Sequence, residues 1–260
     1  MRLIIGEVLK VLPDHIHQQN MHMTLSVPQM TEIDNKLGRL ALGEPITRIL
    51  GRREFWKHTF ILGEETLDPR PESEHLVEEV LDFYSTSPVP KPRILDMGTG
   101  SGCLLLSLLD EIPEATGVGV DISYGALLVA RENARRLNLA KRCMFVQGNW
   151  GKELCGGFDI IVSNPPYISD SDFMGLDDNV CNYDPYRALV SGEDGLECYR
   201  MIHNSLPFLA KKKSFVAMEI GCAQKKAVQK LFFNMLCGVA CVRDLAGKDR
   251  IIKGFYDQSI

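Results

Sequence analysis

From Arg93 to the end of the chain, short apolar runs alternate with segments in which apolar residues recur at helical spacing. The runs predict buried strands, and the segments between them predict amphipathic helices. We expect strands at residues 93–97, 117–121, 144–147, 159–163, 214–220, 239–244 and 250–256. We expect helices at residues 103–109, 125–137, 195–209 and 223–236. This alternation is typical of an α/β fold with a mostly parallel, doubly wound sheet that ends in a hairpin-like pair of strands.

The pattern before Arg93 is different. Apolar residues recur at helical spacing in residues 4–12, where Pro13 follows, and again in residues 24–42. This pattern predicts two helices, the first of which ends at the proline. Residues 54–62 contain two β-rich pieces, which predict a short hairpin.

Residues 69–72, Pro-Arg-Pro-Glu, begin a further helix that we expect to reach residue 84. Proline near the start and acidic residues in the first turn suit a helix N-terminus. Arg70 and Glu72 are therefore interpreted first as helix-start residues. The whole pattern divides the chain into a short helical N-terminal domain at residues 1–44, a β-hairpin linker at 45–70 and an α/β domain at 71–260.

Charge and cysteine usage narrow the class of protein. The 260 residues carry 29 basic and 34 acidic side chains, a formal net charge of −5. This balance argues against a broad electrostatic footprint for nucleic acid. The eight cysteines include no Cys-x-x-Cys pair, so we expect reduced thiols rather than a disulfide framework or a zinc site.

Metal and membrane sites are not expected either. His15, His17 and His22 lie close together, but no acidic or cysteine partner joins them at ligand spacing. No apolar run approaches the length needed to span a bilayer, and the first residues lack the long apolar core of a secretory signal. We therefore expect a cytoplasmic protein with no metal and no membrane contact.

The segment Asp96-Met97-Gly98-Thr99-Gly100-Ser101-Gly102 follows a predicted strand and begins a helix. Glycines let the backbone approach a ligand closely and adopt positive φ. The acid two residues before the first glycine would repel a pyrophosphate but suits the cationic amino-acid end of S-adenosylmethionine. Asp121 ends the next predicted strand, where a carboxylate can accept both ribose hydroxyls of an adenosine cofactor. The alternative interpretation is a tight strand–helix turn without a ligand.

Asn149 and Trp150 follow the third predicted strand. An asparagine and an indole at this place can contact adenine by a hydrogen bond and by stacking. A helix cap next to a core tryptophan explains the same two residues. The spacing alone does not decide between these interpretations.

Asn164-Pro165-Pro166-Tyr167 directly follows the predicted strand at residues 159–163. Two prolines cannot continue a sheet, so the chain must leave the strand in a stiff turn. Asn164 then lies at the carboxyl end of the strand, where ligands bind in open α/β sheets. A side-chain amide, a carbonyl held by proline and an aromatic ring make a compact site for a planar –NH2 group. This tetrad alone leaves adenine, guanine and glutamine amino groups open as acceptors, and a rigid turn without a ligand is the other interpretation.

With these motifs, the chain resembles the protein-(glutamine-N5) methyltransferases (the PrmC/HemK type) that modify peptide chain release factors. The resemblance runs from about Thr24 to the end, and the tetrad by itself is shared with nucleic-acid amino-methyltransferases. The segments that carry it are residues 43–46 (Gly-Glu-Pro-Ile), 53–56 (Arg-Glu-Phe-Trp), 69–74 (Pro-Arg-Pro-Glu-Ser-Glu), 94–102, 162–168, 183–185 (Tyr-Asp-Pro) and 244–250 (Asp-Leu-Ala-Gly-Lys-Asp-Arg).

The resemblance implies a class I S-adenosylmethionine-dependent methyltransferase fold, with a seven-stranded sheet and a small helical N-terminal domain that helps to hold the release factor. Residues 71–260 would then be the methyltransferase domain. It also implies methyl transfer from S-adenosyl-L-methionine to the side-chain nitrogen of the glutamine in the Gly-Gly-Gln loop of release factors. The partner would be a protein rather than a nucleic acid, and the enzyme would be a cytoplasmic monomer.

Carried over residue by residue, the resemblance also implies roles in the site. Gly98, Thr99, Gly100, Ser101 and Gly102 would contact the methionine part of the cofactor, Asp121 the ribose, and Asn149 and Trp150 the adenine. Asn164 and the Pro165 carbonyl would bind the glutamine amide next to the cofactor, and Pro166 and Tyr167 would complete the acceptor site. By accepting both N–H bonds, Asn164 Oδ1 and the Pro165 carbonyl would direct the nitrogen lone pair toward the methyl group.

Three departures from the family pattern bear on these expectations. Only about forty residues precede Gly43, so the helical domain is shorter than is usual in the family. Asp68 stands where an apolar residue is common, and Ser73 replaces the commoner threonine. We expect neither Asp68 nor Ser73 to touch the tetrad, so the departures concern recognition of the partner more than the chemistry.

Two other functions remain open at this point. An adenine or guanine amino-methyltransferase would share the tetrad but would favour a basic surface. A non-catalytic, cofactor-bound module that docks on release factors is the second alternative. Asp121, Asn164 and the intact glycine loop argue for activity.

Overall fold

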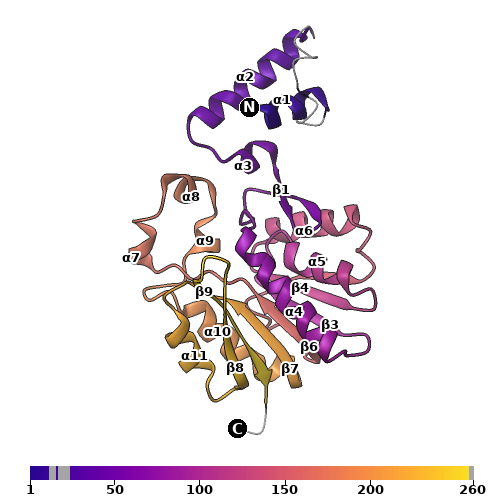
Figure 1. Cartoon of the computed structure of the whole chain (residues 1–260), viewed down its shortest axis with the longest axis vertical. Helices are drawn as coiled ribbons and strands as arrows, with labels where there is room; N and C mark the ends of the chain where they lie inside the picture. The colour runs from indigo at the N-terminus through magenta and orange to yellow at the C-terminus, as the bar shows by residue number, and fades with distance from the viewer. Residues whose placement is uncertain (12–15, 17–23, 258–260) are drawn as a thin grey trace.

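A seven-stranded sheet forms the centre of the molecule (Figure 1). The computed structural model describes residues 1–11, 16 and 24–257. The strands are β3 (Arg93–Met97), β4 (Thr116–Asp121), β5 (Cys143–Gln147), β6 (Phe158–Ser163), β7 (Ala210–Glu219), β8 (Leu236–Arg243) and β9 (Asp249–Tyr256), in the spatial order β5-β4-β3-β6-β7-β9-β8. The first five run parallel, and β9 and β8 pair antiparallel beyond them. The prediction of a mostly parallel sheet with a hairpin-like end is confirmed.

Helices cover both faces of this sheet. The bounds are α4 (Glu74–Thr86), α5 (Cys103–Glu111) and α6 (Tyr124–Arg136) on one face, and α10 (Glu197–Leu209) and α11 (Lys225–Phe232) on the other. Each face has its own buried apolar core, because successive side chains of a strand point to opposite sides of a sheet. Ile94 belongs to the core under α4–α6, and Leu95 belongs to the core under α10 and α11.

Two helices, α1 (Arg2–Leu9) and α2 (Val27–Ala41), lie at the end of the molecule that is remote from β7 and β8 (Figure 1). Ser26 and Gln29 form a capping box at the start of α2, which confirms the second predicted helix. Pro13, which we expected to end the first helix, lies outside the described residues.

A short helix, α3 (Ile46–Leu50), leads into the predicted hairpin of β1 (Arg52–Phe55) and β2 (His58–Ile61). We expected only β structure in this stretch. α3 has five residues, too few to show an apolar period, and Gly51 ends it in a left-handed conformation with φ of 65°. A single 3₁₀ turn, η3 (Pro71–Ser73), precedes α4 and confirms that the Pro-Arg-Pro-Glu segment begins a helix.

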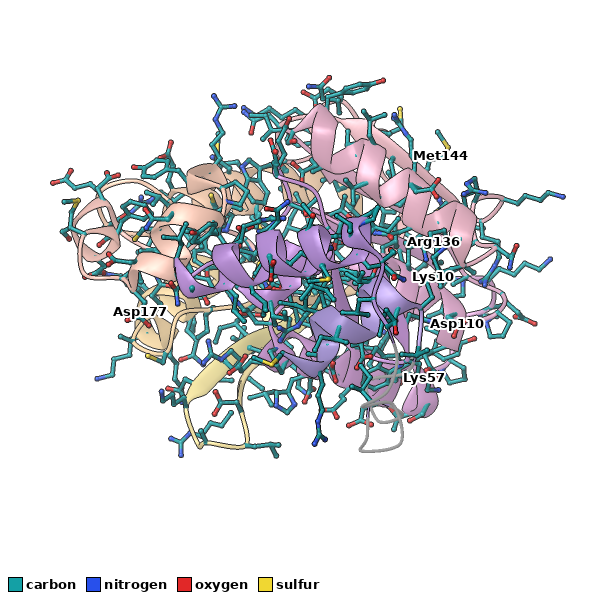
Figure 2. All side chains as sticks on the ribbon, turned by 90° about the horizontal axis from the view of Figure 1, so that it is seen from above. Lys10, Lys57, Asp110, Arg136, Met144 and Asp177 are labelled. Carbon is teal, nitrogen blue, oxygen red and sulfur yellow. The ribbon has the colours of Figure 1, made fainter. Side chains whose placement is uncertain are left out.

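Three more short helices lie between β6 and α10, where the sequence pattern predicted none. They are α7 (Asp170–Phe173), α8 (Asp178–Tyr183) and α9 (Tyr186–Leu189). Helices of four to six residues bury too few side chains to leave a periodic pattern. Seen from above, Asp177 at the start of α8 lies on the opposite side of the molecule from Met144 of β5 (Figure 2).

The helix expected over residues 223–236 is wrong at its end. α11 stops at Phe232, and Leu236 begins β8 by pairing with Tyr256 of β9. Apolar residues at 232 and 236 fit helical spacing as well as the start of a strand, so periodicity alone extended the helix. Pairing with a distant strand decides the outcome, as is general for strands.

Candidate functional site

A cavity of about 720 Å³ lies at the carboxyl ends of β3, β4 and β6. This edge is the one at which open α/β sheets bind ligands, and the volume is in the range of cofactor pockets. Its wall is drawn from residues 65–73, 98–104, 120–124, 148–150, 164–166, 185–190 and 197–201. Segments that are far apart in the sequence therefore meet around one space.

The glycine loop forms one side of the cavity. Gly98 and Gly100 have φ of 75° and 55°, values that favour glycine, and Gly98, Thr99, Gly100 and Ser101 all line the cavity. The N–H groups of Gly98 and Thr99 donate to the carbonyl of Val120 on β4, at 2.8 and 2.9 Å. These bonds hold the loop open toward the space at the strand ends.

Gly102 lies at the end of the same loop but does not line the cavity. It has φ of 80° at the N-cap of α5, and a Cβ there would come within 3.2 Å of the Ala130 and Leu106 side chains. Its place is explained by the turn into α5 and its close approach to α6.

Asp96 lies beneath the loop, fully buried, and not on the cavity wall. Thr99 Oγ1 donates to Asp96 Oδ2 at 2.6 Å. Burial raises the pKa of Asp96 to about 7, although the bond from Thr99 lowers it. Asp96 Oδ1 has no hydrogen-bond partner in the described part of the chain. Asp96 thus supports the loop through Thr99 rather than facing the cavity directly.

Asp121 ends β4 and lines the cavity beside the loop. Its carboxylate accepts from the Gly100 N–H at 2.8 Å and from the Ser123 N–H at 2.9 Å. Burial raises the pKa of Asp121, while the backbone bonds lower it. Each carboxylate oxygen can accept more than one hydrogen bond, so the group remains able to receive hydroxyl donors from a ligand.

Asn149 and Trp150 also line the cavity. Trp150 has φ of 56°, and its indole ring lies 3.6 Å from the position that a Cβ on Gly98 would take. The same ring packs partly against the core under α10 and α11. Trp150 is therefore both a partly buried core residue and part of the cavity wall next to the loop.

Asn164 is the first residue after β6 and is half-buried on the cavity wall. Its Nδ2 donates to Ser73 Oγ at 2.8 Å. Ser73 is buried at the end of η3, and its hydroxyl donates to Glu219 Oε2 at 2.5 Å. With its nitrogen held in this way, the Asn164 amide leaves Oδ1 to accept from a group in the cavity.

The rest of the tetrad is divided between the cavity and the interior. Pro166 lines the cavity, whereas the Pro165 ring is buried behind the wall. The Tyr167 side chain is not part of the wall: burial, and next the charge of Glu219, raise the pKa of Tyr167 to about 12. The family resemblance implies that Tyr167 lies beside the acceptor, and in the structure its ring lies near Gly221, just after the end of β7.

The expectation that neither departure touches the tetrad is wrong for Ser73. Its hydroxyl is the direct partner of the Asn164 side chain, 91 residues away in the sequence. Asp68 behaves as expected in this respect, because its contacts are with Thr47, Arg53 and Asp184 instead. The departure that we assigned to partner recognition therefore lies within the candidate active site.

Comparison with known proteins agrees with this geometry. Residues 58–177 match the family model "Methyltransferase small domain". The catalytic domain of hMettl16, solved in complex with the MAT2A 3′UTR hairpin 6, has a TM-score of 0.62 and 17% identity, with 98% of this chain and 93% of that chain covered, and shows the fold.

Two bacterial relatives decide the family. The release factor glutamine methyltransferase of Rhodospirillum rubrum is 40% identical over 252 residues, which cover 96% of this chain and 76% of the relative. The protein of the same description from Agrobacterium fabrum is 39% identical, with 96% of this chain and 88% of the relative covered. The chain belongs to the release factor glutamine methyltransferase family. The predicted class I fold, methyltransferase activity and S-adenosylmethionine cofactor are confirmed at the level of this family.

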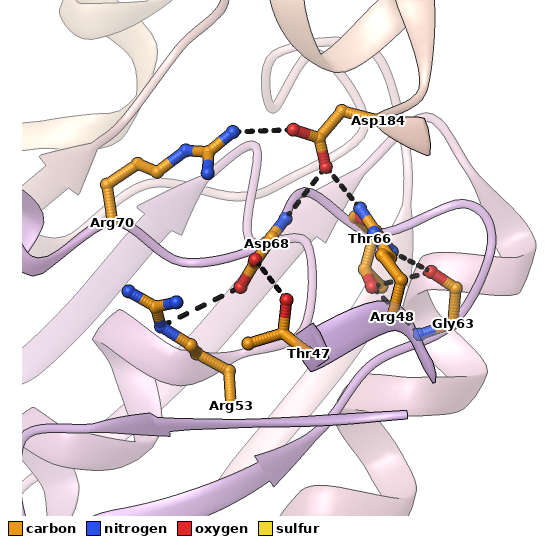
Figure 3. A network of polar contacts seen from close by, with 8 residues as sticks. All are labelled: Thr47, Arg48, Arg53, Gly63, Thr66, Asp68, Arg70 and Asp184. Atoms are coloured by element: carbon orange, nitrogen blue, oxygen red, sulfur yellow. Dashed lines mark hydrogen bonds and ion pairs between the residues drawn. The ribbon is translucent and has the colours of Figure 1, made fainter. Parts of the chain in front are cut away.

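A network of buried charges joins three parts of this methyltransferase around Asp184 (Figure 3). Its carboxylate accepts from Arg48 Nη2 at 2.5 Å and from Arg70 Nη2 at 2.6 Å. Arg48 lies on α3 and also donates to the carbonyls of Gly63 and Thr66. The network thus fixes the segment before α9, which forms one wall of the cavity, to α3 and to the chain that leads into η3.

Sequence reasoning did not predict the contacts of Ser73 with Asn164 and Glu219, nor the ion pair of Arg48 with Asp184. A signal existed for Asp184, because residues 183–185 carried part of the family resemblance. Ser73 was noticed only as a replacement of threonine. Glu219 had no distinguishing local pattern, since an acid at a strand end is common.

Within residues 1–11, 16 and 24–257, no group of three or more His, Cys, Asp or Glu side chains is placed to hold a metal ion. His15, His17 and His22 lie outside the described residues. Over the same ranges, no helix is both long and apolar enough to cross a bilayer.

Proposed function

We propose that this protein methylates the side-chain amide nitrogen of the glutamine in the Gly-Gly-Gln loop of peptide chain release factors. The observation that carries the proposal is the Asn164 amide, whose nitrogen is held by Ser73 at 2.8 Å and whose oxygen is left to the cavity. The –NH2 group of a substrate glutamine needs a hydrogen-bond acceptor in the cavity, and Asn164 Oδ1 supplies one. Membership in the release factor glutamine methyltransferase family supports the protein substrate.

The residues around the cavity fit S-adenosylmethionine as the methyl donor. We assign Gly98, Thr99, Gly100 and Ser101 to its methionine part and Gly102 to the shape of the loop. We assign Asp121 to the ribose hydroxyls and Asn149 with Trp150 to the adenine, because all three line the cavity. The volume of about 720 Å³ supports a ligand of this size.

When bound, S-adenosylmethionine supplies an electrophilic methyl group, and the chain supplies alignment. A primary amide nitrogen is a weak nucleophile, because its lone pair is delocalised into the carbonyl. Asn164 Oδ1 and the Pro165 carbonyl accept its two N–H bonds, which turns the lone pair toward the donor and stabilises positive charge on the nitrogen. The two prolines fix both acceptors before the substrate arrives.

The same proposal includes a monomeric, cytoplasmic protein that does not bind nucleic acid directly. It also includes the domain division at residues 1–44, 45–70 and 71–260. The net charge of −5 supports a protein rather than a nucleic-acid partner. Helix α9 lines the cavity through Tyr186, Arg187 and Ala188 and offers a surface on which a protein loop can rest.

The test uses an unmodified release factor and a variant in which the loop glutamine is replaced by glutamate. Each is incubated with the protein and methyl-labelled S-adenosylmethionine, and the label is mapped by mass spectrometry. We expect label on the glutamine of the first protein and none on the second, since glutamate has no –NH2 group. Equal labelling of both proteins contradicts the acceptor. Cofactor binding without transfer to either protein supports a non-catalytic module instead.

A further inference from the structure

Three side chains from distant parts of the sequence form one hydrogen-bonded line behind the acceptor site. Asn164 follows β6, Ser73 ends η3, and Glu219 ends β7. Asn164 Nδ2 donates to Ser73 Oγ at 2.8 Å, and Ser73 Oγ donates to Glu219 Oε2 at 2.5 Å. Ser73 and Glu219 are almost completely buried, with 2% and 1% of their surfaces exposed.

The protons in this line determine which end of the Asn164 amide faces the cavity. Serine has a single O–H donor, so Ser73 can donate a hydrogen bond either to Glu219 or to Asn164, but not to both. An ionised Glu219 can only accept hydrogen bonds, so the Ser73 hydroxyl donates its hydrogen bond to Glu219. Ser73 must then accept from Asn164 Nδ2, which leaves Oδ1 toward the cavity. This is the arrangement observed.

A protonated Glu219 reverses the order. Its carboxyl can then donate to Ser73 Oγ, and the Ser73 proton becomes available to the Asn164 amide oxygen. The amide is then stable in the flipped orientation, with its own –NH2 group toward the cavity. Two –NH2 groups facing each other cannot form the hydrogen bond that orients a glutamine acceptor.

The surroundings of Glu219 make its carboxyl gain and lose its proton near neutral pH. Burial raises the pKa of Glu219 to about 7, against the opposing effects of Ser73, Arg250 and Tyr167. The groups that face the carboxyl are Ser73 and Glu72 from η3, Arg250 from β9 and the phenol of Tyr167 after β6, while the Tyr199 phenol of α10 donates to the Glu219 backbone carbonyl. The ionised form, and with it the observed order of bonds, therefore predominates above about pH 7 and is lost as the pH falls.

We propose that Ser73 and Glu219 are positioning residues that fix the orientation of the Asn164 amide, and that protonation of Glu219 switches the acceptor site off. The inference rests on the proposed function, because it assigns how the same site holds its glutamine. It adds two residues that act on the acceptor through the Asn164 amide.

The first test compares Ser73→Thr with Ser73→Val, two side chains of the same shape of which only threonine has a hydroxyl. We expect Ser73→Thr to keep kcat within about threefold of wild type, and Ser73→Val to lose about tenfold or more, because the line is broken. Affinity for S-adenosylhomocysteine, measured by calorimetry, should be equal in both variants. Equal kcat values for the two variants overturn the proposal.

The second test needs no change in the fold. The kcat of the wild-type protein is measured with saturating S-adenosylmethionine and release factor between about pH 5.5 and about pH 8.5. We expect the wild-type kcat to decrease as the pH falls, with a midpoint near the Glu219 pKa of about 7. We expect Glu219→Gln to have a lower kcat that does not decrease in this way at acid pH. A wild-type kcat that stays flat, or an acid fall that persists in Glu219→Gln, contradicts the switch.

Asp96 has to be separated from Glu219 in this experiment, because burial raises its pKa to about 7 as well. Asp96 lies under the glycine loop, so its protonation should change cofactor affinity, which is measured at each pH with S-adenosylhomocysteine. The outcomes also separate this inference from the function on which it rests. No transfer by the wild-type protein contradicts the function, whereas transfer with equal Ser73→Thr and Ser73→Val rates contradicts only the positioning role proposed here.

Discussion

The two ends of the cavity are built in different ways. At the glycine-loop end, the important contacts are made by the backbone, and the contributing residues lie within about one strand–helix–strand unit, from Asp96 to Ser123. At the amide end, the contacts are made by side chains that are 91 and 146 residues apart. The first end is a property of a local chain segment, and the second end exists only when the whole sheet has formed.

This difference predicts how each end responds to substitution. A backbone loop changes mainly where a side chain alters φ or enters the ligand space. A line of buried side chains changes when any one member is lost, because the remaining polar groups are left without partners. The following experiments rank these responses from the largest expected effect to the smallest.

Replacement of Asp184 by alanine should have the largest effect on stability. Asp184 and Arg48 have only 5% and 8% of their side chains exposed, so the variant leaves a buried guanidinium without its partner. We expect the free energy of unfolding to fall by about 3–5 kcal/mol, measured by urea denaturation. Asp194→Ala breaks an ion pair with Arg200 in which both side chains are 49% exposed, and should leave stability nearly unchanged. Equal losses in the two variants contradict the buried network.

Replacement of Asn164 by alanine should have the largest effect on turnover. We expect kcat to fall by about 10²–10³-fold, as is typical when a donor or acceptor positioned for the transition state is removed. The dissociation constant of S-adenosylhomocysteine should stay at the wild-type value, because the glycine loop is untouched. Asn204→Ala, on the exposed side of α10, serves as the control. Near-wild-type turnover in Asn164→Ala contradicts the assigned acceptor site.

Replacement of Asp121 by asparagine should produce the opposite pattern. A hydrogen bond to a charged group contributes about 1.5–3 kcal/mol, so cofactor affinity is expected to fall by about ten- to a hundredfold. At saturating cofactor, kcat should remain within about threefold of wild type, because the acceptor site is intact. Calorimetry and steady-state kinetics measure the two quantities. A large loss of kcat with unchanged affinity argues against a ribose contact at Asp121.

Replacement of Gly100 by alanine should reduce stability less than replacement of Asp184. Among the described residues, no atom beyond the two chain neighbours lies within 4 Å of the added Cβ, so the cost is that of a left-handed backbone, about 1–2 kcal/mol. Gly247→Ala is a matched control, since Gly247 has φ of 75°, equally free space and no place on the cavity wall. Both variants should lose the same stability, and only Gly100→Ala should bind the cofactor more weakly. Equal binding by both indicates that the loop does not touch the cofactor.

The same contrast explains what the sequence was able to predict. The glycine loop, Asp121 and the strand before the tetrad are local patterns, and the structure has the strands and the loop where they were expected. Ser73 lies in a segment that carried the resemblance, but its contacts with Asn164 and Glu219 left no local signal, because they depend on β6, β7 and η3 meeting at one point. The helices α7, α8 and α9 were missed because four to six residues are too few to show a period. Sequence patterns thus identified the motifs, and long-range packing determined their partners.

The most direct test of the central claim offers the wild-type protein a choice of acceptors in one tube. An unmodified release factor, total RNA and genomic DNA are mixed with methyl-labelled S-adenosylmethionine, and each fraction is separated and counted. We expect the label in the release factor, with mass spectrometry placing it on the side-chain amide of the Gly-Gly-Gln glutamine. Label on RNA or DNA, with none on the release factor, contradicts a site built around Asn164 for a protein glutamine.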